Sequence, residues 1–122
     1  MKQLMIVDDD PLILEITQMS LEMAGWSVIC AGSGEEAVER AAVEKPDAIL
    51  MDVMMPGMDG PTSCRHIAAN PETAHIPVIL LTAKVQRSEQ REWASLPVAG
   101  MLAKPFDPMR LAEDVKALLG WP

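Results

Sequence analysis

The sequence predicts an α/β fold in which five parallel β-strands form a doubly wound sheet with helices on both faces. Five short apolar runs recur along the chain, and segments with helix-start residues lie between them. The runs do not alternate strictly with polar residues, which is typical of strands buried on both faces in parallel sheets. We expect strands at Leu4–Val7, Trp26–Cys30, Ala48–Met51, Val78–Leu81 and Val98–Leu102.

Capping residues predict where the helices begin. In the first helix, Asp10 is a capping residue, Pro11 suits the first helical position, and Gly25 ends the helix. The other expected starts are the capping-box pattern of Ser33 and Glu36, Gly60-Pro61 and Asp107-Pro108. One more helix, shorter and rich in charge, is expected from Gln86 to Ala94, which makes five helices in all. Strands that alternate with helices in this way predict a parallel sheet covered on both sides.

The chain has the size of one domain. It has 122 residues and contains no linker, low-complexity tract or internal repeat, so we expect residues 1–122 to form a single domain. Hydrophobic residues make up 49% of the chain, which is enough for a full core, but aromatic residues make up only 3%. The core should therefore be aliphatic and rich in methionine.

Charge and hydropathy exclude several functions. The formal net charge is −8 and the 10 basic residues are scattered, which argues against direct binding of nucleic acid. The apolar runs are too short to cross a bilayer, and the N-terminus soon reaches acidic residues, unlike a signal peptide. We expect a soluble cytoplasmic protein that does not insert into membranes.

Polar residues follow four of the predicted strands. These residues are Asp8 and Asp9 after the first strand, Asp52 after the third, Thr82 after the fourth and Lys104 after the fifth. In an open α/β sheet, ligands bind outside the carboxyl ends of the strands. We therefore expect these five side chains to gather at one edge of the sheet.

This set of side chains is suited to phosphoryl transfer onto an aspartate. Clustered carboxylates repel each other unless a cation neutralises them, and oxygen ligands suit Mg²⁺ or Mn²⁺. Lys104 supplies a positive charge fitted to a phosphate, and Thr82 supplies a hydroxyl donor. The carboxylate of Asp52 would attack phosphorus in line while the metal and the lysine offset charge on the equatorial oxygens.

Each of these residues also has a plain structural explanation. Asp8 to Asp10 could form a solvated loop that ends in a helix cap, Thr82 could close a strand, and Lys104 could be a surface charge. Taken singly, these explanations are the better ones. Taken together, five matching residues at the ends of four predicted strands favour a functional site.

Four motifs occur in order along the chain. They are IVDDDP (Ile6–Pro11), DVMMPGMDG (Asp52–Gly60), LLTAK (Leu80–Lys84) and GMLAKPF (Gly100–Phe106). In combination they resemble the receiver domains of two-component response regulators, of the single-domain type found in chemotaxis regulators. The resemblance covers Leu4 to Leu119 and implies a flavodoxin-like fold with five helices and strand order 2-1-3-4-5.

The resemblance also implies which residues bind metal and phosphate. Asp52 would be the phosphoacceptor. Asp9 and Asp52 would bind Mg²⁺ (or Mn²⁺) together with the backbone carbonyl of Met54, and Asp8 would help through a water molecule.

Further roles follow from the resemblance for the remaining motif residues. Thr82 would donate to the phosphoryl group and Lys104 would pair with it. The Lys104-Pro105 peptide bond would be cis. Gly57 and Gly60 would let the loop after Asp52 turn sharply before the next helix.

The chain departs from the family pattern at the switch position. The family usually carries Tyr or Phe three residues before the lysine, where the ring acts with the threonine in switching, and here Met101 stands there. The positions two residues after the acceptor and two after the threonine vary in the family and tune the lifetime of the phosphoryl group. Here they are Met54 and Lys84.

Three functions are compatible with these residues. The leading hypothesis is a switch: a histidine kinase or histidine phosphotransfer protein phosphorylates Asp52, and a changed surface binds a downstream protein. That surface would comprise Gln86–Ala94, the strand through Met101 and the helix from Pro108. On this hypothesis the protein catalyses only its own phosphorylation and dephosphorylation.

The second hypothesis is an aspartate-nucleophile phosphatase, but its usual D-x-D pattern and cap insertion are absent. The third is a scaffold without phosphorylation, which the intact site residues disfavour. The sequence ends shortly after the last predicted helix, at Trp121-Pro122, so we expect a single-domain regulator or a receiver taken from a longer hybrid protein.

Overall fold

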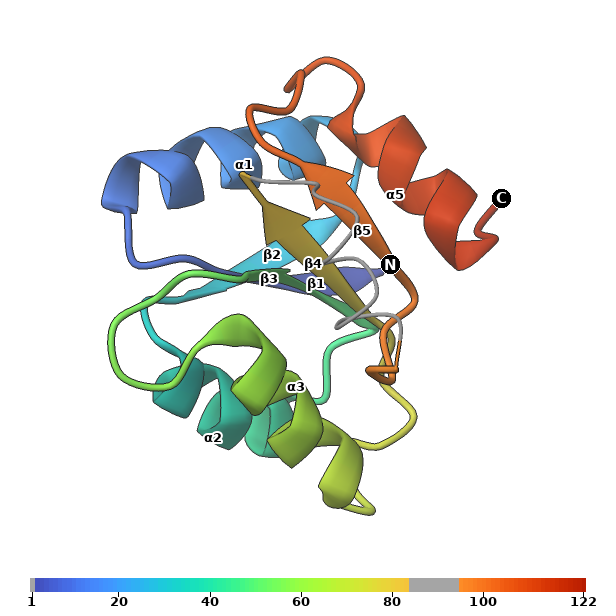
Figure 1. Cartoon of the computed structure of the whole chain (residues 1–122). Helices are drawn as coiled ribbons and strands as arrows, with labels where there is room; N and C mark the ends of the chain where they lie inside the picture. The colour runs from blue at the N-terminus through green and yellow to red at the C-terminus, as the bar shows by residue number, and fades with distance from the viewer. Residues whose placement is uncertain (1, 84–94) are drawn as a thin grey trace.

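Five parallel strands form one sheet in the computed structural model, which describes residues 2–83 and 95–122. The strands are β1 (Gln3–Val7), β2 (Ser27–Ala31), β3 (Ala48–Asp52), β4 (Val78–Thr82) and β5 (Gly100–Ala103). Their order in the sheet is β2-β1-β3-β4-β5, and each neighbouring pair is parallel (Figure 1). This confirms the predicted fold class and strand order.

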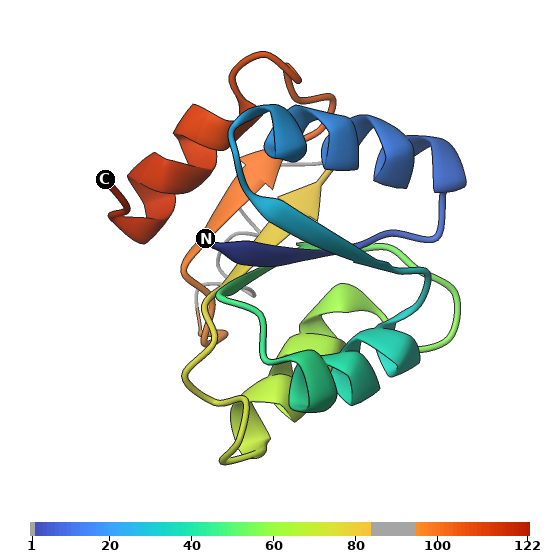
Figure 2. The same cartoon turned by 180° about the vertical axis from the view of Figure 1, so that it is seen from behind.

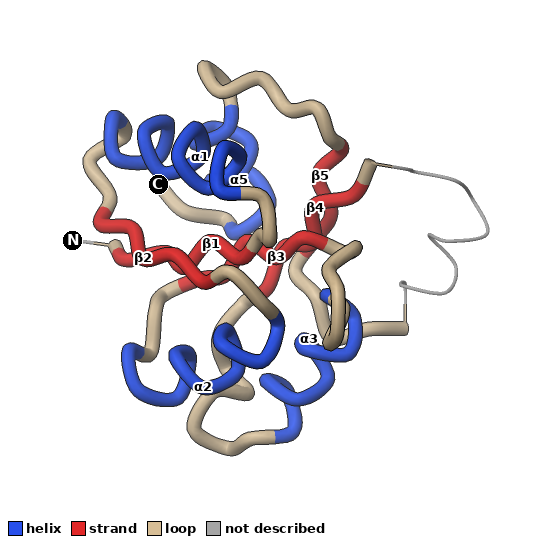
Figure 3. Tube along the Cα trace, turned by 90° about the vertical axis from the view of Figure 1, so that its left-hand side faces the viewer, coloured by secondary structure: helices blue, strands red, loops and turns tan. Residues whose placement is uncertain are grey.

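Helices cover both faces of the sheet. Helices α1 (Pro11–Met23) and α5 (Leu111–Leu119) lie on one face, and α2 (Gly34–Glu44) and α3 (Gly60–Ala69) lie on the other. Figure 2 shows the same two layers from behind, and Figure 3 shows them from the side with the sheet between them. The additional helix expected at Gln86–Ala94 lies outside the described residues.

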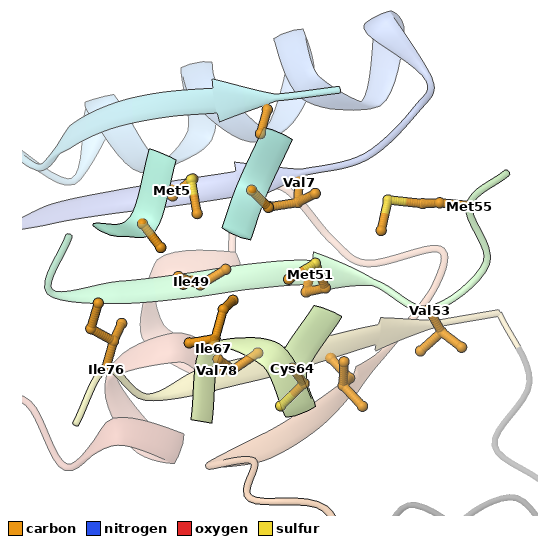
Figure 4. Packing of buried hydrophobic residues seen from close by; sticks show 14 of the residues in the cluster. Met5, Val7, Ile49, Met51, Val53, Met55, Cys64, Ile67, Ile76 and Val78 are labelled. Carbon is orange, nitrogen blue, oxygen red and sulfur yellow. The ribbon is translucent and has the colours of Figure 1, made fainter. Parts of the chain in front are cut away.

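Side chains alternate between two hydrophobic clusters, one on each face of the sheet. In β1, Met5 and Val7 belong to the cluster under α2 and α3, whereas Leu4 and Ile6 belong to the cluster under α1 and α5. This alternation follows from the two-residue period of a strand. Figure 4 shows the first cluster, where side chains of β1 and β3 meet those of α3. Its methionines confirm the aliphatic, methionine-containing core that the composition predicts.

The first two helices begin where their capping residues predict. The Leu12 N–H donates to the carboxylate of Asp10 over 2.9 Å, and Gly25 follows the end of α1 with φ of 92°. At α2, the Glu36 N–H donates to the Ser33 hydroxyl over 3.1 Å. In a capping box the Glu36 carboxylate would accept from the N–H of Ser33. Here it accepts instead from the N–H of Gly32, one residue earlier, over 2.8 Å.

The other two predicted helix starts have different outcomes. Helix α3 begins at Gly60, which confirms the start predicted at Gly60-Pro61. Asp59, not Gly60, is the cap of α3, and its carboxylate accepts from the Thr62 N–H over 2.8 Å. The expectation that a helix opens at Asp107-Pro108 is wrong, because α5 begins at Leu111. The Asp107 carboxylate accepts from the Met109 N–H over 2.9 Å and so closes a local turn, which is the alternative to capping that an Asp side chain offers.

The C-terminal segment packs at the end of the sheet where the strands begin. The rings of Trp26 and Trp121 meet edge to face with centroids 5.5 Å apart, and the Lys2 ammonium lies 4.7 Å from the centre of the Trp121 ring. This contact lies at the opposite end of the sheet from the carboxyl ends of the strands. Within the described residues, no helix has the length and apolar character needed to span a bilayer.

Candidate active site

The polar residues predicted from the strand ends lie at the carboxyl edge of the sheet. Asp8 and Asp9 follow β1 directly, Asp52 and Thr82 are the last residues of β3 and β4, and Lys104 follows β5. Asp8, Asp52 and Thr82 are buried, whereas Asp9 is exposed. The topology, which places β1, β3, β4 and β5 side by side, therefore assembles the set that the sequence predicts.

Backbone hydrogen bonds carry the sheet pairing one residue past the strand ends. The Asp8 N–H donates to the Ala31 carbonyl over 3.2 Å, and the Lys104 N–H donates to the Thr82 carbonyl over 2.8 Å. Each of these bonds fixes the backbone from which a site residue projects. The site is therefore built on rigid elements rather than on loose loops.

The ammonium group of Lys104 bridges two of the acids. Its Nζ atom lies 2.7 Å from Oδ2 of Asp8 and 3.0 Å from Oδ1 of Asp52. The other oxygen of Asp8 accepts from the Asp10 N–H over 3.0 Å. Both oxygens of this buried carboxylate are thus hydrogen-bonded. Sequence reasoning paired Lys104 with a phosphoryl group and missed its contact with Asp8; the signal available was that one lysine shares an edge with several acids.

Burial changes the acid–base properties of both partners in this contact. Burial raises the pKa of Asp52, the hydrogen bond from Lys104 opposes this rise, and the nearby charge of Asp8 adds to it. Burial by itself lowers the pKa of Lys104, but its hydrogen bonds to the two acids outweigh that effect and leave its pKa raised. Lys104 is therefore a cation at neutral pH, and the ionised Asp52 is a more basic carboxylate than an ordinary aspartate.

The acidic residues form an arrangement that fits a hard divalent cation. One carboxylate oxygen each from Asp8, Asp9 and Asp52 lie within 4.8 Å of one another. Ligands bound to Mg²⁺ at about 2.0–2.1 Å in octahedral geometry are separated by roughly 3–4 Å, so small movements of these oxygens would suffice. An all-oxygen set of this kind is the ligand type that Mg²⁺ prefers.

The loop after Asp52 uses its glycines in two different ways. Gly57 has φ of 77°, which confirms the predicted sharp turn. Gly60 does not have a positive φ, and it serves close approach instead: a Cβ there would lie 2.3 Å from the Asp52 carbonyl oxygen. The loop therefore returns tightly against the end of β3 before α3 begins.

The structure places most of the remaining predicted residues. The Lys104-Pro105 peptide bond is cis, as predicted. Met101 lies in β5, half-buried, and packs against the core cluster under α2 and α3. The side chain of Met54 is exposed. Lys84 lies outside the described residues.

The fold and this edge together define a receiver domain, the class of signalling domain that the sequence motifs resemble. A family model described as the response regulator receiver domain matches residues 4–116. The chain therefore belongs to the response regulator receiver domain family of two-component systems.

Similar proteins support the same assignment. The chain is 36% identical over 118 residues to the alkaline phosphatase synthesis transcriptional regulatory protein PhoP of Bacillus subtilis, covering 97% of this chain and 48% of that protein. The chain thus spans about half the length of that relative. Chemotaxis protein CheY4 of Vibrio cholerae superimposes with a TM-score of 0.91 at 28% identity, covering 97% of this chain and 98% of CheY4.

A second similar structure was solved with a metal. The receiver domain of the sensor histidine kinase PA1611 from Pseudomonas aeruginosa PAO1 has a TM-score of 0.87 at 28% identity, covering 98% of each chain. That structure holds a magnesium ion coordinated in its active-site cleft. The acidic cluster described above is consistent with this property of a similar domain.

Proposed function

We propose that this receiver domain is a phosphorylation-activated switch in which Asp52 accepts a phosphoryl group in a Mg²⁺-dependent reaction. The observation that carries the proposal is the contact of Lys104 with Asp52 over 3.0 Å, at an edge where three carboxylates converge. A nucleophile, a fixed cation and a set of metal ligands are thereby within reach of one reacting group.

The residues of the chain have distinct tasks in this proposal. An oxygen of Asp52 attacks the phosphorus of a phosphohistidine, and the nitrogen–phosphorus bond breaks with its electron pair leaving on the histidine. Lys104 moves from its two carboxylates toward the transferred oxygens, and the Thr82 hydroxyl donates to one of them. The product is an acyl phosphate on Asp52.

The metal would be held by Asp9 and Asp52, with the Met54 carbonyl and, through water, Asp8. When bound, Mg²⁺ would offset charge on the oxygens of the transferring phosphoryl group. The indirect role of Asp8 agrees with its geometry, because both of its oxygens already accept hydrogen bonds from the chain.

The proposed partners are proteins on both sides of the reaction. A histidine kinase or histidine phosphotransfer protein supplies the phosphoryl group, and a downstream protein binds the changed surface. We propose that β5 and α5 contribute to this surface together with Gln86–Ala94, which lies outside the described residues. The function implies a cytoplasmic protein whose chemistry is confined to its own Asp52, rather than a turnover enzyme.

Mass spectrometry of the intact protein after treatment with acetyl phosphate and Mg²⁺ tests this function. We expect one phosphoryl adduct that maps to Asp52 and is absent from the Asp52→Asn variant. Steady release of phosphate without a stable adduct would indicate a phosphatase, and no adduct with or without metal would indicate a scaffold.

A further inference from the structure

The loop between β3 and α3, residues 53–59, is attached firmly to the sheet at its base. The Gly60 N–H donates to the Val53 carbonyl over 2.9 Å, and the Val53 N–H donates to the Leu81 carbonyl over 3.0 Å. Met55 is buried in the core cluster. Beyond Met55, Pro56 and Gly57 are exposed and Met58 is half-buried, so this outer part depends on contacts from elsewhere in the fold.

Helix α2 supplies such a contact at its first turn. Oε1 of Glu35 accepts from the Met58 N–H over 2.7 Å, although the two residues are 23 positions apart. A Cβ on Gly34 would lie 2.5 Å from the Met58 carbonyl oxygen, and a Cβ on Gly57 would lie 3.2 Å from the Glu35 carboxylate. Two consecutive residues of α2 therefore meet the same loop residue, one through a hydrogen bond and one through close approach.

We propose that Glu35 is a positioning residue that holds this loop in the conformation that binds the metal. The inference rests on the proposed function, in which the Met54 carbonyl is a metal ligand. Met54 stands between the base of the loop and its anchor at Met58, with its side chain exposed to solvent. A loop that is already fixed loses less conformational entropy when its carbonyl binds a cation, so an anchor at Met58 raises affinity without touching the metal.

A matched control for this role lies in the next residue. Glu36 carries the same charge in the same first turn of α2, but its carboxylate accepts from the Gly32 N–H over 2.8 Å, within the segment that leads into α2. Removing either glutamate therefore subtracts one negative charge from the same helix end. Only the loss of Glu35 removes the hydrogen bond to the Met58 N–H.

The experiment compares Glu35→Ala, Glu36→Ala and Glu35→Gln in the full chain. Calorimetry measures Mg²⁺ affinity, and NMR measures hydrogen exchange of the Met58 amide in the metal-free protein. Charge-assisted hydrogen bonds that water reaches contribute modestly, so we expect Glu35→Ala to bind Mg²⁺ about three- to tenfold more weakly than Glu36→Ala. Glu35→Gln retains an acceptor oxygen and should recover most of the affinity.

The Met58 amide should exchange faster in Glu35→Ala than in Glu36→Ala. Equal Mg²⁺ affinities for the two alanine variants would overturn the proposal, and so would a Gln variant as weak as Glu35→Ala, since charge alone would then explain the loss. Faster Met58 exchange without any loss of affinity would also overturn it. A wild-type protein that binds no Mg²⁺ would instead reject the proposed function itself.

Discussion

The Nζ atom of Lys104 lies 2.7 Å from Oδ2 of Asp8, although the two residues are 96 positions apart in the sequence. The same ammonium lies 3.0 Å from Asp52. The lysine thus pairs with two acids before any phosphoryl group arrives. Among the described residues, three carboxylates converge around this one lysine, so the cluster remains attractive to a divalent cation.

Replacing Lys104 by Met should separate the effect of this lysine on folding stability from its effect on Mg²⁺ binding. Two largely buried carboxylates would lose their cation, so we expect the free energy of unfolding to fall by about 1–3 kcal/mol in the absence of metal. Mg²⁺ should bind more tightly than to the wild type, because a competing positive charge is gone, and should restore part of the stability. Urea unfolding with and without Mg²⁺ measures both effects, with Arg65→Met, an exposed cation on α3, as control.

The raised pKa of Lys104 also sets a pH dependence with a defined sign. A lysine whose pKa is higher in the folded state stabilises the fold fully below its ordinary pKa of 10.5 and loses that contribution as the pH rises through the folded value. We expect the wild type to lose more stability than Lys104→Met between pH 9 and pH 12, values chosen to bracket about 10.5. Parallel losses in the two proteins would contradict this assignment.

Replacing Asp9 by Ala should abolish Mg²⁺ binding. Lys104 engages the other two acids, and one carboxylate with a carbonyl cannot replace the missing ligand. Calorimetry is preferred to tryptophan fluorescence, because Trp26 and Trp121 pack together at the opposite end of the sheet from the site. Glu39→Ala, which removes an exposed acid on α2, should bind as the wild type does. Unchanged affinity in the Asp9 variant would exclude this site.

Replacing Asp52 by Asn should stabilise the metal-free protein. Burial raises the pKa of Asp52, so folding favours its protonated form. Stability therefore falls as the pH rises from 3.8, the ordinary pKa of this carboxyl group, through its higher pKa in the folded protein. A neutral amide avoids this cost at pH 7. We expect a rise in Tm of about 2–5 °C by calorimetry, typical of an improvement on the order of 1 kcal/mol. A Tm equal to or below that of the wild type would show that the Lys104 contact outweighs burial.

The phosphoryl group on Asp52 should be long-lived for this class of domain. Hydrolysis needs a water in line with the oxygen–phosphorus bond, and the apolar, exposed side chain of Met54 can screen that approach while orienting no water. A charged lysine at position 84 has no acceptor for the proton of that water. Asn at position 54 with Glu at position 84 should shorten the lifetime, measured by loss of the adduct over time. A wild type that loses phosphate equally fast would refute this.

Met101 should make the switch less sharp than an aromatic ring would. It packs half-buried against the core cluster, and a flexible thioether fits several arrangements of its surroundings. We expect a smaller free-energy gap between the two states, so that the resting protein populates the active form measurably. With Mg²⁺ and beryllofluoride as a phosphate mimic, the labelled Met101 methyl signal should move along a line between two averaged states.

The variant Met101→Tyr should place the resting protein further from the active end of that line. The proposed output surface can be read in the same spectra from signals of β5, α5 and residues Gln86–Ala94. If beryllofluoride shifts only signals beside Asp52 and leaves Met101 and Gln86–Ala94 unmoved, the signal does not leave the site by this route.

Much of the fold follows from local signals in the sequence. The apolar runs placed all five strands within two residues of their observed bounds, because a strand with helices on both faces of its sheet carries apolar side chains on both sides, even in the half-buried edge strands β2 and β5. The helix start at Asp107-Pro108 was misplaced for an equally local reason, since an Asp side chain can close a turn as readily as it caps a helix.

The sequence by itself determined which residues reach the candidate site, because polar residues at the ends of parallel strands must share one edge of the sheet. Only the tertiary structure decided how these residues are paired. Lys104 binds Asp8 as well as Asp52, and Glu35 binds the Met58 N–H across two elements. Such contacts depend on distances of a few ångströms between segments far apart in the chain, and neither residue type nor spacing encodes those distances.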